Sequence, residues 1–408
     1  MLGVLRNRTY RHLFTAQVVA LLGTGLATVA LGLLAHDLAG AEAATVLGTA
    51  LTIKMVAYVG LGPVLTALAA RLPRRPLLIC TNLIRGGVAV CLPLVSEVWQ
   101  VYVLILVLQA SSATFTPVFQ AVIPEVLPRD RDYTRALSLS RLAYDLESLL
   151  SPMMAAALLT VLTYPGLFLG TALGFAVAAL LIGTVVLPPR EVGAQQQGRW
   201  AAITVGVRMF ARWPALRSLA VLNLSVAVAT ALVLVTTVTY VREDLGGSEA
   251  DVAVALGAFG AGSMVVALAL PRVLDNREQR PLFLAAPLLH TGTFALLATV
   301  VSMVDGWWWP LLGAWLLLGA GCSLVLTPTA RLLRDHAGSG ELPALLAAQF
   351  SLSHAGFLVT YPLAGWAGTH LAPQTALVGC AVLTGGCAVA ARVLWRIRQA
   401  EPADFAAA

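Results

Sequence analysis

The sequence predicts an all-α membrane protein of twelve transmembrane helices, arranged as two pseudo-symmetric six-helix bundles. Two compositional observations support this fold class. Only 11% of the 408 residues are charged and 59% are hydrophobic, whereas soluble domains carry about 25% charged residues. The 35 glycines and 21 prolines are spread through the apolar runs, as membrane helices tolerate. The third observation is an internal repeat.

The repeat relates the two halves of the chain. The segment Arg74-Arg75-Pro76-Leu77-Leu78 returns as Gln279-Arg280-Pro281-Leu282-Phe283. Likewise, Thr116-Pro117 returns as Thr327-Pro328, and Ser151-Pro152 as Tyr361-Pro362. All these offsets lie near half the chain length. A duplicated, parallel six-span unit is typical of one large class of secondary transporters.

Each half contains six apolar stretches long enough to cross a bilayer. The predicted spans are 13–35, 44–70, 76–96, 98–122, 137–163, 165–187, 216–240, 250–274, 281–303, 307–331, 343–370 and 373–398. The first is longer than the core of a secretory signal, so we interpret it as an uncleaved helix. We expect an N-terminal bundle over 1–188 and a C-terminal bundle over 216–408.

The segment 189–215 is expected to be a cytoplasmic linker that contains an amphipathic helix. Trp200, Ile203, Val207 and Phe210 recur at helical spacing among arginines. Such a helix would lie flat on the inner leaflet, or it would only tether the two bundles.

The distribution of arginine predicts the orientation. Apart from Arg85, Arg141 and Arg242, the arginines lie at the termini or in the loops after every second span. Since positive residues accumulate on the cytoplasmic side, both termini are expected in the cytoplasm. The protein would then be a multi-pass protein of the bacterial cytoplasmic (inner) membrane.

Five charged residues lie deep inside predicted spans, where each costs roughly 2.5–3.5 kcal/mol on insertion scales. They are Lys54, Arg85, Arg141, Asp145 and Glu147, and Lys54 is the only lysine in the chain. Arg141 and Asp145 can pair within one helix. Glu147 points elsewhere, so it needs Lys54 or Arg85 as its partner. Either these pairs are structural, or Glu147 or Asp145 exchanges a proton during transport while its cation changes partner.

Uncharged polar residues inside the spans either line a pathway or bridge helices. The cavity candidates are Gln17, Gln109, Asn223, Gln349 and His354. The five cysteines form no CxxC motif, so neither a disulfide framework nor a metal site is indicated. We find no phosphate-binding loop. No cofactor and no enzymatic activity are therefore expected, and an ion gradient, most simply of protons, would supply the energy.

The sequence resembles the major facilitator superfamily over essentially its whole length. The loop after the second span is similar to the family's signature of glycine, aspartate and arginines. It retains Arg71, Arg74 and Arg75, but Ala70 occupies the position of the aspartate. The resemblance implies that these arginines gate the conformational change, and the missing acid leaves them to find another carboxylate.

The resemblance extends to a motif of the family's exporters. Leu150-Ser151-Pro152 in the fifth span is similar to its glycine-proline motif, with serine in place of glycine, and Tyr361-Pro362 is the counterpart in the eleventh span. The resemblance implies that Pro152 and Pro362 take part in gating the conformational change, and it favours export over import. Other segments resemble the siderophore and macrolide exporters, and Arg6 to Phe14 looks closest to nickel-resistance exporters.

These observations predict proton-coupled export of a small molecule, a drug or a siderophore-like compound. Efflux of nickel, cobalt or a metal chelate and import of a small metabolite are the alternatives. The expected partners are the substrate, protons and membrane lipid. The positive net charge of +6 is explained by arginines that meet anionic lipid, so nucleic acid is not expected. We expect a monomer.

Overall fold

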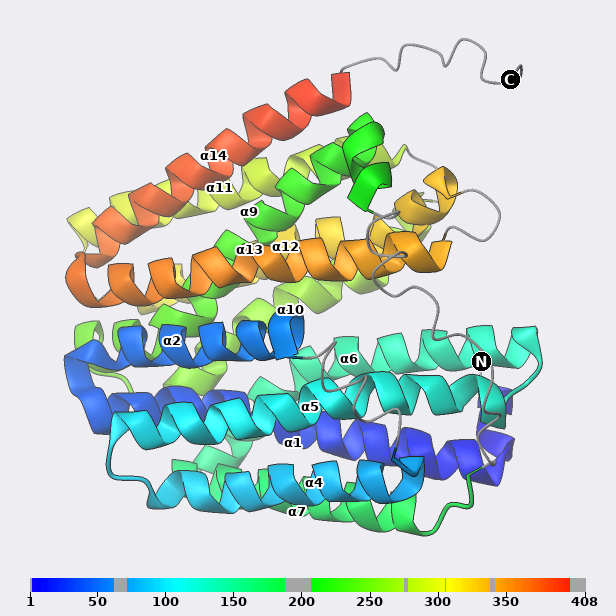
Figure 1. Cartoon of the computed structure of the whole chain (residues 1–408). Helices are drawn as coiled ribbons and strands as arrows, with labels where there is room; N and C mark the ends of the chain where they lie inside the picture. Colours follow the sequence, from blue (N-terminus) through cyan, green and yellow to red (C-terminus); the bar gives the residue numbers. More distant parts are fainter. Residues whose placement is uncertain are drawn as a thin grey trace, which may run out of the picture. The chain divides into compact units, whose positions relative to one another are not determined.

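The computed structural model describes residues 2–61, 72–187, 207–274, 278–304, 306–337 and 342–396. Within these ranges all regular structure is helical, because a chain that spans lipid must satisfy its backbone hydrogen bonds within each segment. Figure 1 shows the helices coloured along the sequence.

The first half contains α1 to α7. The long helices are α1 (Arg8–Ala39), α2 (Ala43–Val56), α4 (Arg74–Cys91), α5 (Val98–Val126), α6 (Asp130–Leu159) and α7 (Tyr164–Gly183). Short 3-10 turns precede or join them: η1 (Leu2–Arg6), η2 (Gly40–Glu42) and η4 (Leu92–Leu94). The π-helical η3 (Ala57–Leu61) continues α2.

The second half contains α9 to α14. These helices are α9 (Pro214–Thr239), α10 (Glu249–Leu274), α11 (Gln279–Met303), α12 (Trp308–His336), α13 (Leu342–His370) and α14 (Pro373–Arg396). The π-helical η5 (Tyr240–Asp244) extends α9. Residues 207–212 form a short helix in which Met209 and Phe210 are buried. The rest of the predicted linker helix, including Trp200 and Ile203, lies outside the described residues.

Every predicted span corresponds to a helix, so the predicted fold class is confirmed. The second span differs in detail, since α2 changes to π-helical geometry after Val56 and 62–71 lie outside the description. Nine stretches in the described part of the chain are long and apolar enough to cross a membrane, and α1 with α2 forms one of them, Arg8–Val56.

The chain divides into two compact units. The first comprises 1–192, 233–260 and 361–371, and the second comprises 193–232, 261–360 and 372–408. The first unit therefore takes segments from both halves of the sequence, whereas the second consists of the linker region and segments of the second half. The assignment of whole bundles to 1–188 and 216–408 stays a prediction.

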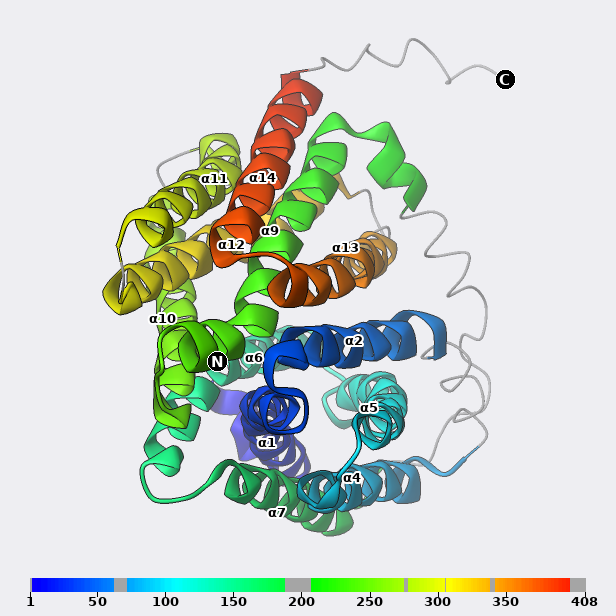
Figure 2. The ribbon, with the colours of Figure 1, turned by 90° about the vertical axis from the view of Figure 1, so that its left-hand side faces the viewer.

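In the first unit, α7 packs against both α1 and α4, and α4 packs against α5. Figure 2 shows these helices nearly end-on. Thr171 of α7 donates a hydrogen bond of 2.7 Å to the Gly23 carbonyl oxygen of α1. A methyl group at Gly174 would lie 3.1 Å from the Val19 carbonyl oxygen. Small residues thus let α1 and α7 approach closely, as is common between helices in lipid.

In the second unit, α11 packs against α12 and α14. Phe283 of α11 and Trp395 of α14 are in ring contact at 5.6 Å between centroids. The hydroxyl of Thr291 on α11 donates to that of Thr384 on α14 at 3.0 Å. The approach of α10 to α12 depends on Gly262, since a methyl group there would overlap the Leu316 carbonyl oxygen.

We predict that Gly262→Ala lowers the free energy of unfolding by about 1–3 kcal/mol, because the backbone of α12 must move away. The matched control is Gly313→Ala on α12, whose added methyl group meets nothing within 4 Å. Thermal denaturation of the purified protein in detergent measures both. Equal midpoints for the two variants would contradict the close contact between α10 and α12.

Candidate functional site

The first feature of the site is a pair of opposite charges on two helices of the first unit. Lys54 lies near the end of α2, and Glu147 lies in the middle of α6. Their side chains are both partly buried and attract each other electrostatically. Of the two cations that the sequence offers to Glu147, Lys54 therefore interacts with it. The side chains of Arg141 and Asp145, also on α6, lie outside the described residues.

The carboxylate of Glu147 packs against α1. A methyl group at Gly25 would lie 2.8 Å from its Oε1 atom, so only a residue without a side chain fits on α1 at this point. Glu147 of α6 consequently lies against α1, and Lys54 of α2 is the described cation whose charge acts on it.

The second feature is Arg85 of α4, which is 5% exposed. Its guanidinium lies between two aromatic rings, with its Cζ atom 4.4 Å from the ring centre of Phe115 on α5 and 4.5 Å from that of Phe175 on α7. The Nη2 atom donates to Asn82 Oδ1 at 2.6 Å. Two cation–π contacts and a hydrogen bond offset much of the cost of burying this charge.

A small cavity of about 40 Å³ adjoins the ring of Phe115. Gln17, Phe115, Gln120 and Ser140 are among the residues that line it. The Ser140 hydroxyl donates to Gln17 Oε1 at 3.1 Å, which links α6 to α1. The cavity has room for about one or two water molecules, so Gln17 bridges helices beside a small polar space.

Two of the polar candidates of the second half bridge helices, and the third contacts its own helix. Asn223 of α9 and Gln349 of α13 exchange two amide hydrogen bonds of 3.0 and 3.2 Å. His354 lies 2.7 Å from the Phe350 carbonyl oxygen on its own helix and stacks on the Phe350 ring at 4.0 Å. Gln109 is buried on α5.

A fully buried histidine connects three helices of the second unit. The Nε2 atom of His290 on α11 lies 3.2 Å from the Leu318 carbonyl oxygen of α12. A carbonyl can only accept, so Nε2 carries the proton and Nδ1 accepts from the Ser225 hydroxyl of α9 at 2.9 Å. The ring is thereby held as a neutral bridging group. The described residues contain no group of three or more His, Cys, Asp or Glu side chains that could hold a metal ion.

At the helix ends that the arginine distribution assigns to the outer side, α2 contacts the end of α13 within the first unit. The Thr45 hydroxyl lies 2.7 Å from that of Thr369 and 3.2 Å from the Gly365 carbonyl oxygen. A methyl group at Gly48 would lie 2.7 Å from the Tyr361 carbonyl oxygen, and one at Gly365 2.9 Å from that of Ala44. We call this set of contacts the α2–α13 contact.

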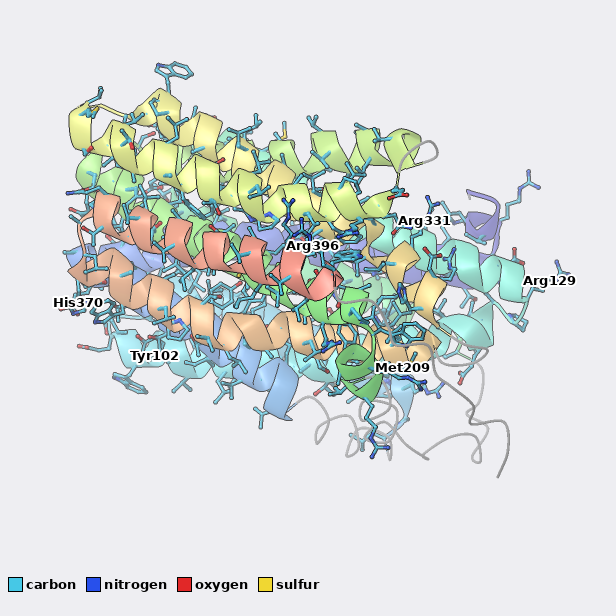
Figure 3. The ribbon with its side chains drawn as sticks, turned by 90° about the horizontal axis from the view of Figure 1, so that it is seen from above. Tyr102, Arg129, Met209, Arg331, His370 and Arg396 are labelled. Carbon is cyan, nitrogen blue, oxygen red and sulfur yellow. The ribbon has the colours of Figure 1, made fainter. Side chains whose placement is uncertain are left out.

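The outer end of α1 also contacts the second half of the sequence. His36 Nδ1 lies 3.3 Å from Glu243 Oε1 of η5, which is an ion pair when His36 is protonated. A methyl group at Gly32 would lie 2.8 Å from Val238. Close by, Tyr164 of α7 donates to Asp37 at 2.6 Å. In Figure 3, Tyr102 and His370 lie at one end of the first unit and Arg129 at the other.

At the opposite end, two of the predicted gating arginines have partners in the first half. Arg74 forms an ion pair with Glu125 of α5, so it has found an acid other than the absent aspartate. Arg75 donates to the Gly183 carbonyl oxygen of α7. Pro362 is exposed within α13. Arg71 and the side chain of Pro152 lie outside the described residues.

Comparison with known proteins identifies the family. The model of the Major Facilitator Superfamily matches residues 13–303 and 219–408, so the chain belongs to this superfamily. It is a multi-pass membrane transporter, and the fold is not that of an enzyme class. Comparison with curated proteins finds no match.

Solved structures share the fold at low sequence identity. A variant of the nucleoside transporter NupG is 13% identical with a TM-score of 0.72, covering 94% of this chain and 100% of that chain. A bacterial homolog of the human lysosomal transporter Spinster is 12% identical with a TM-score of 0.71, covering 96% and 97%. A POT family transporter in complex with 5-aminolevulinic acid is 12% identical with a TM-score of 0.72, covering 95% of each chain.

Several residues of the site were not singled out from the sequence. Phe115 and Phe175 gave no signal, because single aromatic residues in apolar helices are ordinary core residues. Asn82 could have been found, since it lies three residues before Arg85 and so on the same helix face. Gly25 gave no signal either, because its role depends on which helix packs against it.

We predict that Arg85→Lys lowers the free energy of unfolding by about 2 kcal/mol, because an ammonium group cannot contact both rings and Asn82 in the same geometry. Arg11→Lys, an exposed change on α1, is the control and should have almost no effect. Thermal denaturation in detergent measures both variants. If Arg85→Lys and the control had the same denaturation midpoint, the aromatic contacts would contribute nothing to the stability.

We also predict that Thr45→Cys combined with Thr369→Cys forms a disulfide, because the two hydroxyl oxygens are 2.7 Å apart and disulfides need close Cβ atoms. The background should lack the five native cysteines. Reductant-sensitive mobility on a denaturing gel, after cleavage in the central linker, reports the bond. The control pair Thr49→Cys with Thr369→Cys, one turn further along α2, should remain reduced. Its crosslinking to the same extent would argue against the α2–α13 contact.

Proposed function

We propose that this protein is a proton-coupled exporter of a small organic molecule, in which Glu147 carries the proton. The observation that carries this proposal is the place of Glu147, which is partly buried against Gly25 of α1 and lies within the electrostatic influence of Lys54 on α2. A charged pair in a membrane span is expensive, and such residues commonly mark proton relays in transporters. Arg85 already has structural partners in two aromatic rings and Asn82, whereas the described partner of Lys54 is the titratable acid Glu147.

The coupling follows from the place of Lys54 on α2. Protonation removes the negative charge of Glu147, and with it the attraction that holds Lys54 towards α6. The same helix carries Thr45 and Gly48, which make the α2–α13 contact about 9 to 14 Å further along at 1.5 Å per residue. A change at Glu147 is thereby transmitted through one rigid helix to the outer helix ends.

The α2–α13 contact serves in this proposal as the outer gate. Thr45, Gly48 and Gly365 hold the gate closed in the described conformation, and opening it requires α2 and α13 to separate. The bundles over 1–188 and 216–408 are the bodies that move, about the linker 189–215. Arg74, through its ion pair with Glu125, orders the inner end of the first bundle.

Export of an organic molecule is the direction and cargo that we favour. Ser151-Pro152 and Tyr361-Pro362 resemble the motif of the family's exporters, and the second of them begins the segment of α13 that contacts α2. Two structures of the same fold are of a nucleoside transporter and of a transporter with 5-aminolevulinic acid, both small organic cargoes. We propose that the protein acts as a monomer in the bacterial inner membrane, with cytoplasmic termini.

The first experiment identifies the transported substrate. An efflux-deficient host that expresses the chain is challenged with macrolides, tetracyclines, siderophore overload, nickel and cobalt. Selective resistance to an organic group is expected, whereas resistance to the metals alone would support metal efflux. Accumulation by everted vesicles against uptake by whole cells then separates export from import.

With that cargo, we predict that Glu147→Gln reduces transport driven by an imposed pH gradient to the level without a gradient, because the amide cannot exchange a proton. Glu97→Gln, an exposed change at the start of α5, should leave transport unchanged. Proteoliposomes with an imposed gradient provide the measurement. Asp145→Asn is tested beside it, and gradient-driven transport in both variants would rule out an acid of α6 as the proton carrier.

A further inference from the structure

The inference concerns Ser151, which lies one turn after Glu147 on α6. Residues four apart share a helix face, so the Ser151 hydroxyl and the Glu147 carboxylate point to the same side. Ser151 is 1% exposed. Its Oγ atom is buried and has no hydrogen-bond partner among the residues that the structure describes.

That missing partner is unusual for a hydroxyl on a transmembrane helix. Such hydroxyls ordinarily donate to the carbonyl oxygen four residues earlier. In this chain Thr28, Ser111 and Ser112 do so, at 3.1, 2.9 and 3.0 Å. For Ser151 that carbonyl belongs to Glu147, and the bond is not made. A buried hydroxyl without a partner costs free energy, which favours a role in another state of the protein.

The surroundings of Ser151 narrow that role. A methyl group at Gly25 of α1 would overlap the Oγ and Cβ atoms of Ser151 and would lie 2.8 Å from Glu147 Oε1. The hydroxyl and the carboxylate therefore share the space that Gly25 leaves open. In the described state Lys54 attracts the carboxylate, and Ser151 is left without a bond.

We propose that Ser151 is a positioning residue for Glu147, whose hydroxyl oxygen accepts a hydrogen bond from the protonated carboxyl group. The carboxylate takes one proton from a hydronium ion in the transport path, so that one O–H bond of that ion breaks, a new O–H bond forms on Glu147 and water is released. The neutral carboxyl then turns from Lys54 to Ser151. This inference rests on the proposed function, since it assumes that Glu147 is protonated during transport.

The charged groups around the pair are few. From α2 the cation is Lys54, and α1 presents Gly25 here, with His36 and Asp37 at its far end. Glu125 is at the last turn of α5 and Tyr164 at the first turn of α7. The side chains of Arg141 and Asp145, on α6 itself, lie outside the described residues. Lys54 is thus the described charge that competes with Ser151 for the carboxyl group.

The test is infrared titration of the purified full-length protein in lipid, which needs no substrate. The carbonyl band that Glu147→Gln removes belongs to the protonated Glu147 carboxyl. We predict that Ser151→Ala moves the midpoint of this band to lower pH by roughly half a unit to one unit, because the protonated form loses one hydrogen bond. The band also moves to the frequency of a carboxyl group without a hydrogen bond.

The matched control is Ser112→Ala on α5, which removes another buried hydroxyl, one that is bonded to its own backbone. It should leave the band and its midpoint unchanged. Ser151→Gly, which restores the family's residue, should behave as Ser151→Ala does and provides a second variant. An unchanged band, or a midpoint moved to higher pH, in both Ser151 variants would overturn the proposal.

The two proposals fail separately. If Glu147→Gln removes no titrating band and keeps gradient-driven transport, the proposed function is wrong. If that band titrates in the parent protein but does not respond to the Ser151 variants, only the role of Ser151 is wrong.

Discussion

The structure depends on one constraint, which is that a charge buried in lipid needs compensation from nearby side chains. The chain meets this constraint in two ways. Arg85 is enclosed by Phe115, Phe175 and Asn82, which lie on α4, α5 and α7 of the first half. Lys54 and Glu147, on α2 and α6, attract each other, so this compensation changes when the two helices move relative to each other. The first arrangement suits a structural charge and the second a switch.

The two halves of the sequence use this constraint differently, although they share an origin as a repeat. The first half carries the five charged residues that lie deep inside the predicted spans. In the second half, neutral polar pairs bridge helices, namely Asn223 with Gln349 and His290 with Ser225. Amide and hydroxyl groups on neighbouring helices hold a bundle together without a need for counterions. This difference suggests that coupling resides in one half and that the other provides a stable counterpart.

Much of the fold could be predicted from the sequence, because apolar length and arginine placement report on lipid directly and require no knowledge of packing. The site could be predicted only in part. Helix depth reduced the partners of Glu147 to Lys54 and Arg85, but the choice between them depends on how α2 and α4 pack. The contact of Thr45 with Thr369 joins residues 324 positions apart, and nothing local to either threonine indicates it. The absence of the family's aspartate near Arg74 predicted that another carboxylate would pair with the arginines, but the sequence did not indicate that this carboxylate is Glu125.

The position of Lys54 has a consequence for energetics. While Glu147 is ionised the pair is electrically neutral, and once the acid is neutralised a net positive charge remains inside the bilayer. A transmembrane voltage acts on such a charge with about 2.3 kcal/mol per 100 mV for complete passage across the field. Any displacement of α2 that carries the ammonium part of the way is driven or opposed by the membrane potential. The single lysine of this chain would then make its cycle electrogenic.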